Sequence, residues 1–394
     1  MSVAPNGSIS PPQERLVSLD AYRGFIMLML VSEAFNLSAT AGHFAGNRFW
    51  DFIDYQFSHA AWTGCSFWDL IQPSFTFMVG VAMPYSYANR RARGESRGKT
   101  IAHVIKRSLI LIFLGIFLRS MGRSQTYFTF EDVLTQIGLG YAFVYLVLGK
   151  PFRVQIAALV VILVGYWLVF ALYPLPAPDF DYKSVGVGED SKLFTGFFAH
   201  WNKNTNPAHA FDVWFLNLFP RESPFLYNGG GYQTLSFIPS MGTMVFGILA
   251  GELLRKPREH GEKFRKLVLW GISCVVLGYL LHLSVCPSVK RIWTPSWTVF
   301  SAGWTFLMLA GFYWVCDLKG YRKWTVPLLV FGMNSIFMYC TGPFRRFIEA
   351  NLKTHFGQDL FSGAWGPTFE SVTVTAIIGL IGYWMYRRKI FIRI

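Results

Sequence analysis

The chain has 394 residues, of which 53% are hydrophobic and 18% aromatic, whereas only 15% are charged. Globular domains usually carry about 25% charged residues, so this composition excludes an ordinary soluble domain and indicates a polytopic membrane protein. The net charge of +14 does not indicate a nucleic-acid partner, because the basic residues stand in short runs between apolar stretches, as membrane-flanking anchors do.

A polar tail at residues 1–19 precedes ten apolar stretches, and each stretch approaches the roughly 20 residues that span ~30 Å of hydrocarbon. They are residues 22–38, 67–88, 104–121, 131–149, 154–173, 234–254, 267–285, 298–316, 325–341 and 368–386. We therefore predict an all-α bundle of about ten transmembrane helices, formed by residues 20–394 as one domain. Ala39-Thr40-Ala41 resembles a signal-peptidase site, but Glu33 interrupts the preceding apolar stretch, so we expect a retained helix.

Lysine and arginine are concentrated in alternate connecting segments. If both termini are cytoplasmic, the cytoplasmic segments hold 24 of the 36 basic residues in about 75 residues of chain. This bias predicts an N-in, C-in orientation with two long outer connectors, residues 39–66 and 174–233. The second connector is rich in aromatic, Asn and Gly residues, which suits sugar binding and suits equally well a segment that simply lies on the bundle.

The most informative stretch is SHAAWTGCSFWDLIQPSFTFMVG, residues 58–80, which runs from a polar connector into an apolar helix. Imidazole is the side chain whose ordinary pKa lets it exchange protons near neutral pH. His59 stands at the outer mouth of the second predicted span and is therefore a candidate catalytic base. His59, Trp62 and Trp68 would also suit a purely interfacial anchor, so that interpretation stays open.

Polar residues inside apolar stretches are costly and therefore informative. Such residues are Glu33, Asp69, Gln72, Gln136 and Asn334. Glu33 lies at the depth where it would orient His59 or, alternatively, extend to the interface as a helix-end residue. Asp20 and Arg23, spaced i and i+3, form a candidate ion pair at the cytoplasmic end of the first helix. The five cysteines show no metal-ligand spacing, so no metal is expected, while Cys65 and Cys286 are candidates for an outer disulfide.

Several segments together resemble the heparan-α-glucosaminide N-acetyltransferase family of transmembrane acyltransferases. After SLDAYRGFIML and the His59 stretch, they are VLTQIGLGY (133–141), FDVWFLNLF (211–219), GGYQTLSFIPSMGTMVFGILAGE (230–252), FSAGWTFLMLAGFYWVCDLKG (300–320) and FGMNSIFMY (331–339). The resemblance implies a bundle of ten or eleven helices that uses cytosolic acetyl-CoA to acetylate a sugar amine on the far side. It also implies that the catalytic His of an HASW-like motif is His59, in His-Ala-Ala-Trp.

The chain departs from the family pattern at three places. The position of an Asn late in the first helix is Ala34, flanked by Glu33 and Asn36. A usual Arg is replaced by Gln136, and an acidic segment by residues 228–233, so the acceptor need not be heparan sulfate.

These observations predict a bacterial inner-membrane enzyme that moves acetyl from cytosolic acetyl-CoA to a periplasmic amino sugar or glycan. The predicted catalytic residues are His59, Glu33 and Asn36, and the predicted acceptor contacts are Trp62, Asp69, Asp212 and Asn334. Arg23 is the predicted coenzyme A contact, with Lys106 and Arg107 as further candidates beside it. His59 acts either as general base or as an acetylated nucleophile. A homodimer is a further expectation, and a proton-coupled sugar transporter is the alternative function.

Overall fold

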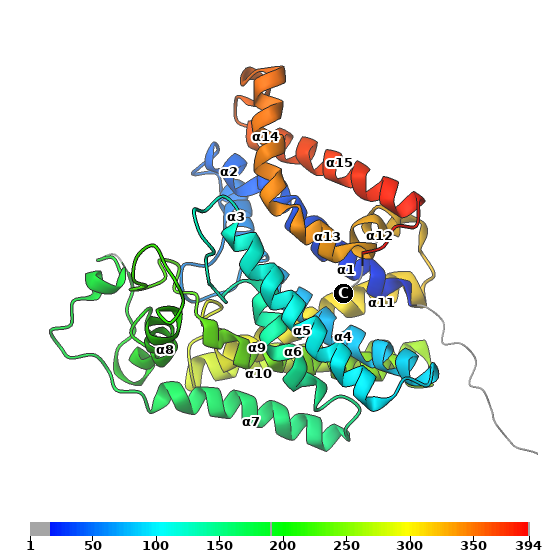
Figure 1. Ribbon diagram of the computed structural model, residues 1–394, viewed down its shortest axis with the longest axis horizontal. Helices are drawn as coiled ribbons and strands as arrows, with labels where there is room; N and C mark the ends of the chain where they lie inside the picture. The colour runs from blue at the N-terminus through cyan, green and yellow to red at the C-terminus, as the bar shows by residue number, and fades with distance from the viewer. Residues whose placement is uncertain (1–15, 190, 393–394) are drawn as a thin grey trace, which may run out of the picture.

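The computed structural model describes residues 16–189 and 191–392, and within these ranges the chain is helical and contains no strand (Figure 1). The α-helices are α1 (Val17–Val31), α2 (Leu37–Gly42), α3 (Arg48–Phe57), α4 (Ile71–Ala92), α5 (Arg97–Ser120), α6 (Val133–Tyr145), α7 (Phe152–Ala171), α8 (Pro207–Leu216), α9 (Phe237–Arg255), α10 (His260–Ser284), α11 (Pro295–Tyr313), α12 (Val326–Met333), α13 (Ser335–Cys340), α14 (Gly342–Phe356) and α15 (Gly366–Arg387). The all-α class is confirmed. Most of the predicted polar tail lies outside the described residues, and its last part, from Val17, is already helical.

Six helices in the described ranges are long and apolar enough to cross a membrane, and a seventh is added if α1 and α2 form one bent span. The six are α5, α7, α9, α10, α11 and α15, some with an adjoining turn. The prediction of about ten spans is therefore confirmed only as a multi-helix membrane bundle. Helices do occupy the other predicted positions, but α6 has 13 residues, or about 20 Å, and α12 is separated from α13 at Asn334.

The first predicted helix, 22–38, is broken rather than continuous. Residues Glu33 to Asn36 all have positive φ angles, between 40° and 55°, and α1 and α2 meet at an angle of 47°. Left-handed backbone costs roughly 1–2 kcal/mol per non-Gly residue, so neighbouring groups have to hold it. Arg345 donates to the carbonyl oxygen of Val31 at 2.9 Å, and Ser371 donates to that of Ser32 at 2.7 Å.

The bundle is assembled around α9, which is buried almost all round and packs along α4. At Gly80 and Gly247 the two backbones approach so closely that a methyl group on either residue would lie 2.1 Å from a carbonyl oxygen of the other helix. Small residues at such crossings permit the close backbone packing that stabilises helices in membranes. α1 packs against α12 in the same way, and this packing fixes α1 beside α4.

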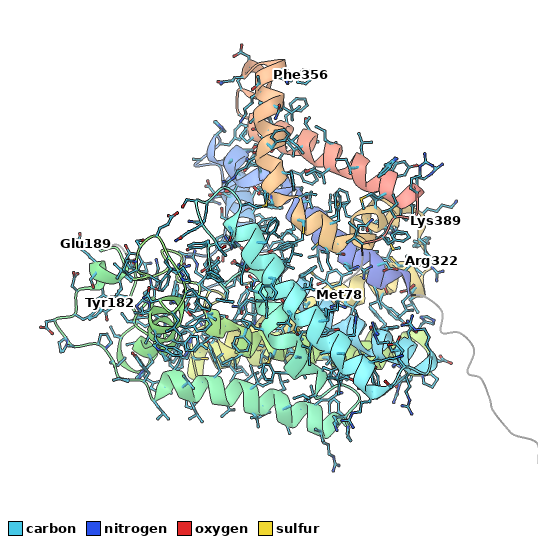
Figure 2. The ribbon with its side chains drawn as sticks, in the orientation of Figure 1. Met78, Tyr182, Glu189, Arg322, Phe356 and Lys389 are labelled. Carbon is cyan, nitrogen blue, oxygen red and sulfur yellow. The ribbon has the colours of Figure 1, made fainter. Side chains whose placement is uncertain are left out.

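Several connectors lie on two opposite sides of the molecule, whereas the end of α14 at Phe356 stands apart from both (Figure 2). Figure 2 shows Tyr182 and Glu189, of the long connector, on one side and Arg322 and Lys389 on the other. We call the first side, which also carries His59, the His59 end, and the second the Arg322 end. The predicted outer connector and two of the predicted cytoplasmic segments thus lie apart, although the structure itself contains no membrane.

The long connector, 174–233, holds itself together through its amide side chains. Asn204 donates to the carbonyl oxygens of Val185 and Asn228, both at 2.9 Å, and accepts a hydrogen bond from Gln233. Gln136, on α6, donates to the carbonyl oxygens of Phe130, Gln233 and Thr234 and so ties the connector to the bundle. Part of the Asn-rich composition that suggested sugar binding therefore serves to satisfy backbone groups.

Candidate active site

Two loops distant in sequence meet at the His59 end. Thr63 and Val289 form an isolated antiparallel bridge, and Gly64 donates to the carbonyl oxygen of Ser288 at 3.4 Å. The first loop leads into α4, whereas the second, residues 285–294, joins α10 to α11. This pairing sets the segment that contains His59 against the segment that contains Lys290.

Asp69 holds the imidazole of His59 in place. It lies in the turn before α4, its side chain is 1% exposed, and its Oδ1 is 2.8 Å from Nδ1 of His59. Its Oδ2 accepts backbone hydrogen bonds from Ala60 at 3.1 Å and Ser66 at 3.2 Å. Because a carboxylate only accepts, this arrangement favours the tautomer with its proton on Nδ1 and the lone pair on Nε2.

A buried lysine completes the cluster. Nζ of Lys290 lies 3.1 Å from Oδ1 of Asp69 and 3.1 Å from Nδ1 of His59, and the lysine side chain is 7% exposed. Burial lowers the pKa of Lys290, against the opposing effect of the Asp69 charge. Burial alone would raise the pKa of Asp69, but its hydrogen bond with His59 and the charge of Lys290 hold that pKa well below its usual range.

The opposite edge of the imidazole is open. The His59 side chain is 40% exposed, and within the described chain no hydrogen bond engages Nε2. Two cavities have His59 and Trp68 in their walls, one of about 650 Å³ and one of about 400 Å³. A histidine with one nitrogen fixed by a carboxylate and the other facing a cavity is arranged to exchange a proton with a bound molecule.

The smaller cavity has further charged groups in its wall. Its walls include Arg119, Glu131, Asn228 and Tyr232. Burial raises the pKa of Glu131 to about 7, and one oxygen of this carboxyl accepts from the side-chain amide of Asn228 at 2.5 Å. The neighbouring Asp132 caps the start of α6. Glu131 therefore changes charge near neutral pH within the cavity that contains the candidate base.

The structure places Glu33 and Asn36 in the wall of the larger cavity, together with His59. Glu33 does not contact His59; its nearest charged partner is Arg345, at 3.9 Å, and its side chain is 64% exposed. Both residues belong to the left-handed turn after α1, which explains why they point into a cavity from the end of a helix. Their predicted catalytic roles stay predictions.

Of the four predicted acceptor contacts, Asp69 is the one that forms a hydrogen bond with His59. Trp62 donates through Nε1 to the carbonyl oxygen of Trp201 at 3.1 Å and packs on Gly231, and thus supports the long connector. Asp212 is 2% exposed and accepts from the backbone of Thr234 at 2.9 Å.

The remaining predicted contact, Asn334, is fully buried on the C-terminal side of α12. Its amide donates to the carbonyl oxygen of Ile390 at 3.0 Å and accepts from the backbone of Ile392 at 2.9 Å. The geometry therefore gives Asn334 a role in holding the C-terminal segment.

A third cavity, of about 850 Å³, has a strongly basic wall. Its charged lining residues are Arg23, Arg90, Arg93, His103, Lys106 and Arg107. Arg23 donates to the carbonyl oxygen of Gly332 at 2.8 Å and pairs with Asp20 at 2.8 Å, as its spacing predicts. Figure 2 labels Met78, which lines this cavity, near the centre of the molecule. The structure thus brings together the three basic residues that the sequence singled out.

The predicted disulfide is absent, because Cys65 and Cys286 are both free thiols. Cys286 instead donates to the hydroxyl of Ser296 at 3.5 Å. In the described part of the chain, no three His, Cys, Asp or Glu side chains gather as a metal site.

Lys290, Glu131 and Arg119 are the site residues that sequence reasoning missed. Each lies in or beside a predicted connector, where a charged side chain is expected to be exposed to solvent. The one signal was position. Arg119 and Glu131 stand at the outer ends of predicted helices, and Lys290 lies in the connector between the predicted helices 267–285 and 298–316, on the side already assigned to His59.

Comparison with known proteins confirms the resemblance drawn from the motifs. The chain is 24% identical over 440 aligned residues to the heparan-α-glucosaminide N-acetyltransferase of Homo sapiens and 22% identical over 433 to that of Mus musculus. The alignments cover 98% and 96% of this chain, but it spans only 61% and 60% of the length of these relatives. No family model matches the chain.

Proposed function

We propose that this chain is a membrane N-acetyltransferase that transfers acetyl from acetyl-CoA to the amino group of a sugar. The observation that carries the proposal is the His59–Asp69 pair, 2.8 Å apart, at the wall of two cavities that both have His59 in their lining. The similarity to two N-acetyltransferases over nearly the whole chain supports the same reaction.

His59 is the proposed general base. A sugar ammonium has to lose its proton before nitrogen attacks the thioester carbonyl, and Nε2 is free to accept that proton. As the C–N bond forms and the C–S bond breaks, the coenzyme A thiolate leaves and takes a proton from the imidazolium. The attacking nitrogen loses its second proton to the Nε2 freed in this way, and that proton passes to solvent. Asp69 keeps Nδ1 protonated throughout and balances the charge that His59 acquires.

A covalent route uses the same geometry. Nε2 attacks the thioester, acetyl-imidazole forms as the thiolate leaves, and the sugar amine then takes the acetyl group. Labelled acetyl-CoA supplied without an acceptor distinguishes the two routes, because only the covalent route leaves acetyl on His59.

The smaller cavity is the proposed acceptor site. Glu131 provides an anion for the ammonium, and Asn228 and Tyr232 add the amide and aromatic groups that suit a sugar ring. Arg119 lines both cavities at the His59 end and is available to an acidic group on the glycan.

The basic cavity is the proposed entrance for acetyl-CoA, because its charges match the phosphates of the donor. Phe75 lines the basic cavity and Tyr339 lines both cavities at His59, and their rings stack with centroids 6.4 Å apart. A thioester arm that passes this ring pair reaches His59 from the basic side. With the basic segments cytoplasmic, the donor enters from the cytoplasm and the acceptor from the periplasm of a bacterial inner membrane.

The rival function is a proton-coupled sugar transporter in which His59 and Glu33 exchange protons. The pairing of Glu33 with Arg345 rather than with His59 gives that function less support. Purified protein in detergent, supplied with labelled acetyl-CoA and a panel of amino sugars, separates the two functions. Acetylated sugar is the expected product, whereas intact donor with every acceptor would contradict the proposed reaction.

A further inference from the structure

The cluster at His59 contains a charge that proton abstraction by a His–Asp pair does not require. Lys290 lies 3.1 Å from both His59 and Asp69, on a loop 231 residues away from His59 in the chain. Removing two charges from water is costly, and a well-packed apolar pair is often more stable than a buried ion pair. The burial of the Lys290 ammonium beside Asp69 therefore suggests a use beyond stability.

The effect of Lys290 on His59 follows from the position of the lysine ammonium relative to the imidazole ring. A carboxylate 2.8 Å from Nδ1 favours the imidazolium, and a histidine that is already an imidazolium has no lone pair with which to accept a proton. A lysine ammonium 3.1 Å from the same nitrogen opposes this effect, because it repels the imidazolium. Asp69, Lys290 and a neutral imidazole together carry no net charge.

We propose that Lys290 is a positioning residue that offsets the charge of Asp69 beside the imidazole of His59 and thereby opposes protonation of that ring. Lys290 also donates to the carboxylate oxygen that holds Nδ1 and so fixes that oxygen in place. This inference rests on the proposed role of His59 as the base, and it adds the group that sets the proton occupancy of that base.

Other charges around the cluster act on the same equilibrium from greater distance. They are Arg291 and Cys65 on the two paired loops, and Arg119, Glu131, Asp132, Tyr232 and Tyr339 on the cavity wall. Arg291 donates to the carbonyl oxygens of Gly230 and Ala60 and thus faces the backbone. Glu131 and Asp132 line the smaller cavity, and Lys290 is the cation within 3.1 Å of the His59 ring.

The test compares Lys290→Met with Lys290→Arg, which keeps the charge. In Lys290→Met, the acidic limb of the kcat/KM profile should move upward by about 1–3 pH units, the size of shift that an adjacent charge produces. Lys290→Arg should leave that limb close to wild type. Acetyl-CoA binding and the elution profile in detergent show whether each variant is folded.

A second measurement does not depend on acetyl transfer. Diethyl pyrocarbonate modifies free-base imidazole, and mass spectrometry of the peptide containing His59 gives its labelling rate at each pH. The pH midpoint of labelling should rise in Lys290→Met, by the same amount as the kinetic limb, and stay in place in Lys290→Arg. If Lys290→Met is not folded, Lys290→Gln, which still donates to Asp69, takes its place.

The two measurements separate this inference from the proposed function. A loss of turnover that is equal at every pH, with an unchanged labelling midpoint, would reduce Lys290 to a structural anchor. If no acetyl transfer occurs at all, the labelling midpoints still decide whether Lys290 controls the proton on His59.

Discussion

The cavities at His59 and the basic cavity are built in opposite ways. At His59, three charged or titratable side chains lie within hydrogen-bond distance of one another, and two of them are almost fully buried. In the basic cavity, six basic side chains surround a volume of about 850 Å³, where Arg90 and Arg93 pair with Glu95 and Arg23 pairs with Asp20. A proton transfer requires a fixed geometry, whereas recognition of a polyanion requires mainly an excess of positive charge. This difference supports the proposal that chemistry takes place in the first region and donor binding in the second.

Removal of His59 should have the largest effect and should fall on chemistry alone. General-base assistance is worth about 10²–10⁴-fold, and loss of a covalent nucleophile costs more. His59→Ala should therefore abolish most transfer and leave acetyl-CoA binding nearly intact. Turnover and equilibrium binding of the donor, measured on one preparation, check both parts.

Three other histidines in the connectors serve as controls. His43, His200 and His209 lie in or beside the predicted outer connectors, and their Ala variants should keep most activity. Similar small losses for all four variants, or His59→Ala turnover above about a tenth of wild type, would remove His59 from the mechanism.

Replacement of Asp69 should have the next largest effect. Asp69→Asn keeps the shape of the side chain, but the amide no longer specifies that Nδ1 carries the proton. We expect kcat to fall by up to about 10⁴-fold, with little change in the KM for acetyl-CoA. A change confined to KM would place Asp69 in binding and weaken the contrast between the two regions.

Neutralisation of basic side chains in the basic cavity should weaken acetyl-CoA binding and leave kcat unchanged. Hydrogen bonds to charged groups contribute about 1.5–3 kcal/mol each, so Lys106→Gln with Arg107→Gln should raise the KM for acetyl-CoA at least about tenfold. The exposed Lys323, outside this cavity, provides the matched control as Lys323→Gln. If kcat falls while KM stays constant, the two regions are not separate in function.

Glu131 should make acceptor binding depend on pH. Burial raises the pKa of Glu131 to about 7, so the carboxyl is mainly neutral below pH 7 and mainly anionic above it. An ammonium binds the anion, and the KM for the amino sugar should therefore fall as pH rises through 7.

Glu131→Gln removes that charge and tests the assignment. The variant should raise the acceptor KM several-fold at pH 8 and change it little at pH 6. The KM for acetyl-CoA, measured in parallel, should not change at either pH. Equal effects at both pH values would place the ammonium elsewhere.

The sequence allowed prediction of the parts of the site that lie close together along the chain. His59 and Asp69 are ten residues apart in one stretch, so a polar connector leading into an apolar helix indicated both of them. Arg23, Lys106 and Arg107 followed from the depth of their helices, because helix ends of one sign gather on one side of a bundle.

The parts that were missed depend on contacts between distant segments. Lys290 reaches Asp69 across 221 residues, through a loop pairing for which one sequence contains no signal. No Gly or Pro marks the break at Glu33 in the sequence. The carbonyl oxygens near the break accept hydrogen bonds from Arg345 and Ser371, and these residues lie near the other end of the chain. The predicted number of spans is not confirmed for a related reason, because length and composition alone do not identify short or polar helices such as α4 and α6 as spans.

Glu33→Gln should have the smallest effect and is the strictest test of the contrast. Had Glu33 held His59, its loss would shift the pH profile of turnover; the structure instead pairs it at 3.9 Å with Arg345. An ion pair with one partner this exposed contributes about 0–1 kcal/mol, so turnover should fall by less than about fivefold. The acidic limb of the profile should stay in place. A shift of that limb matching the one expected for Lys290→Met would show that charge control of His59 extends across the larger cavity, and that Lys290 is not its principal source.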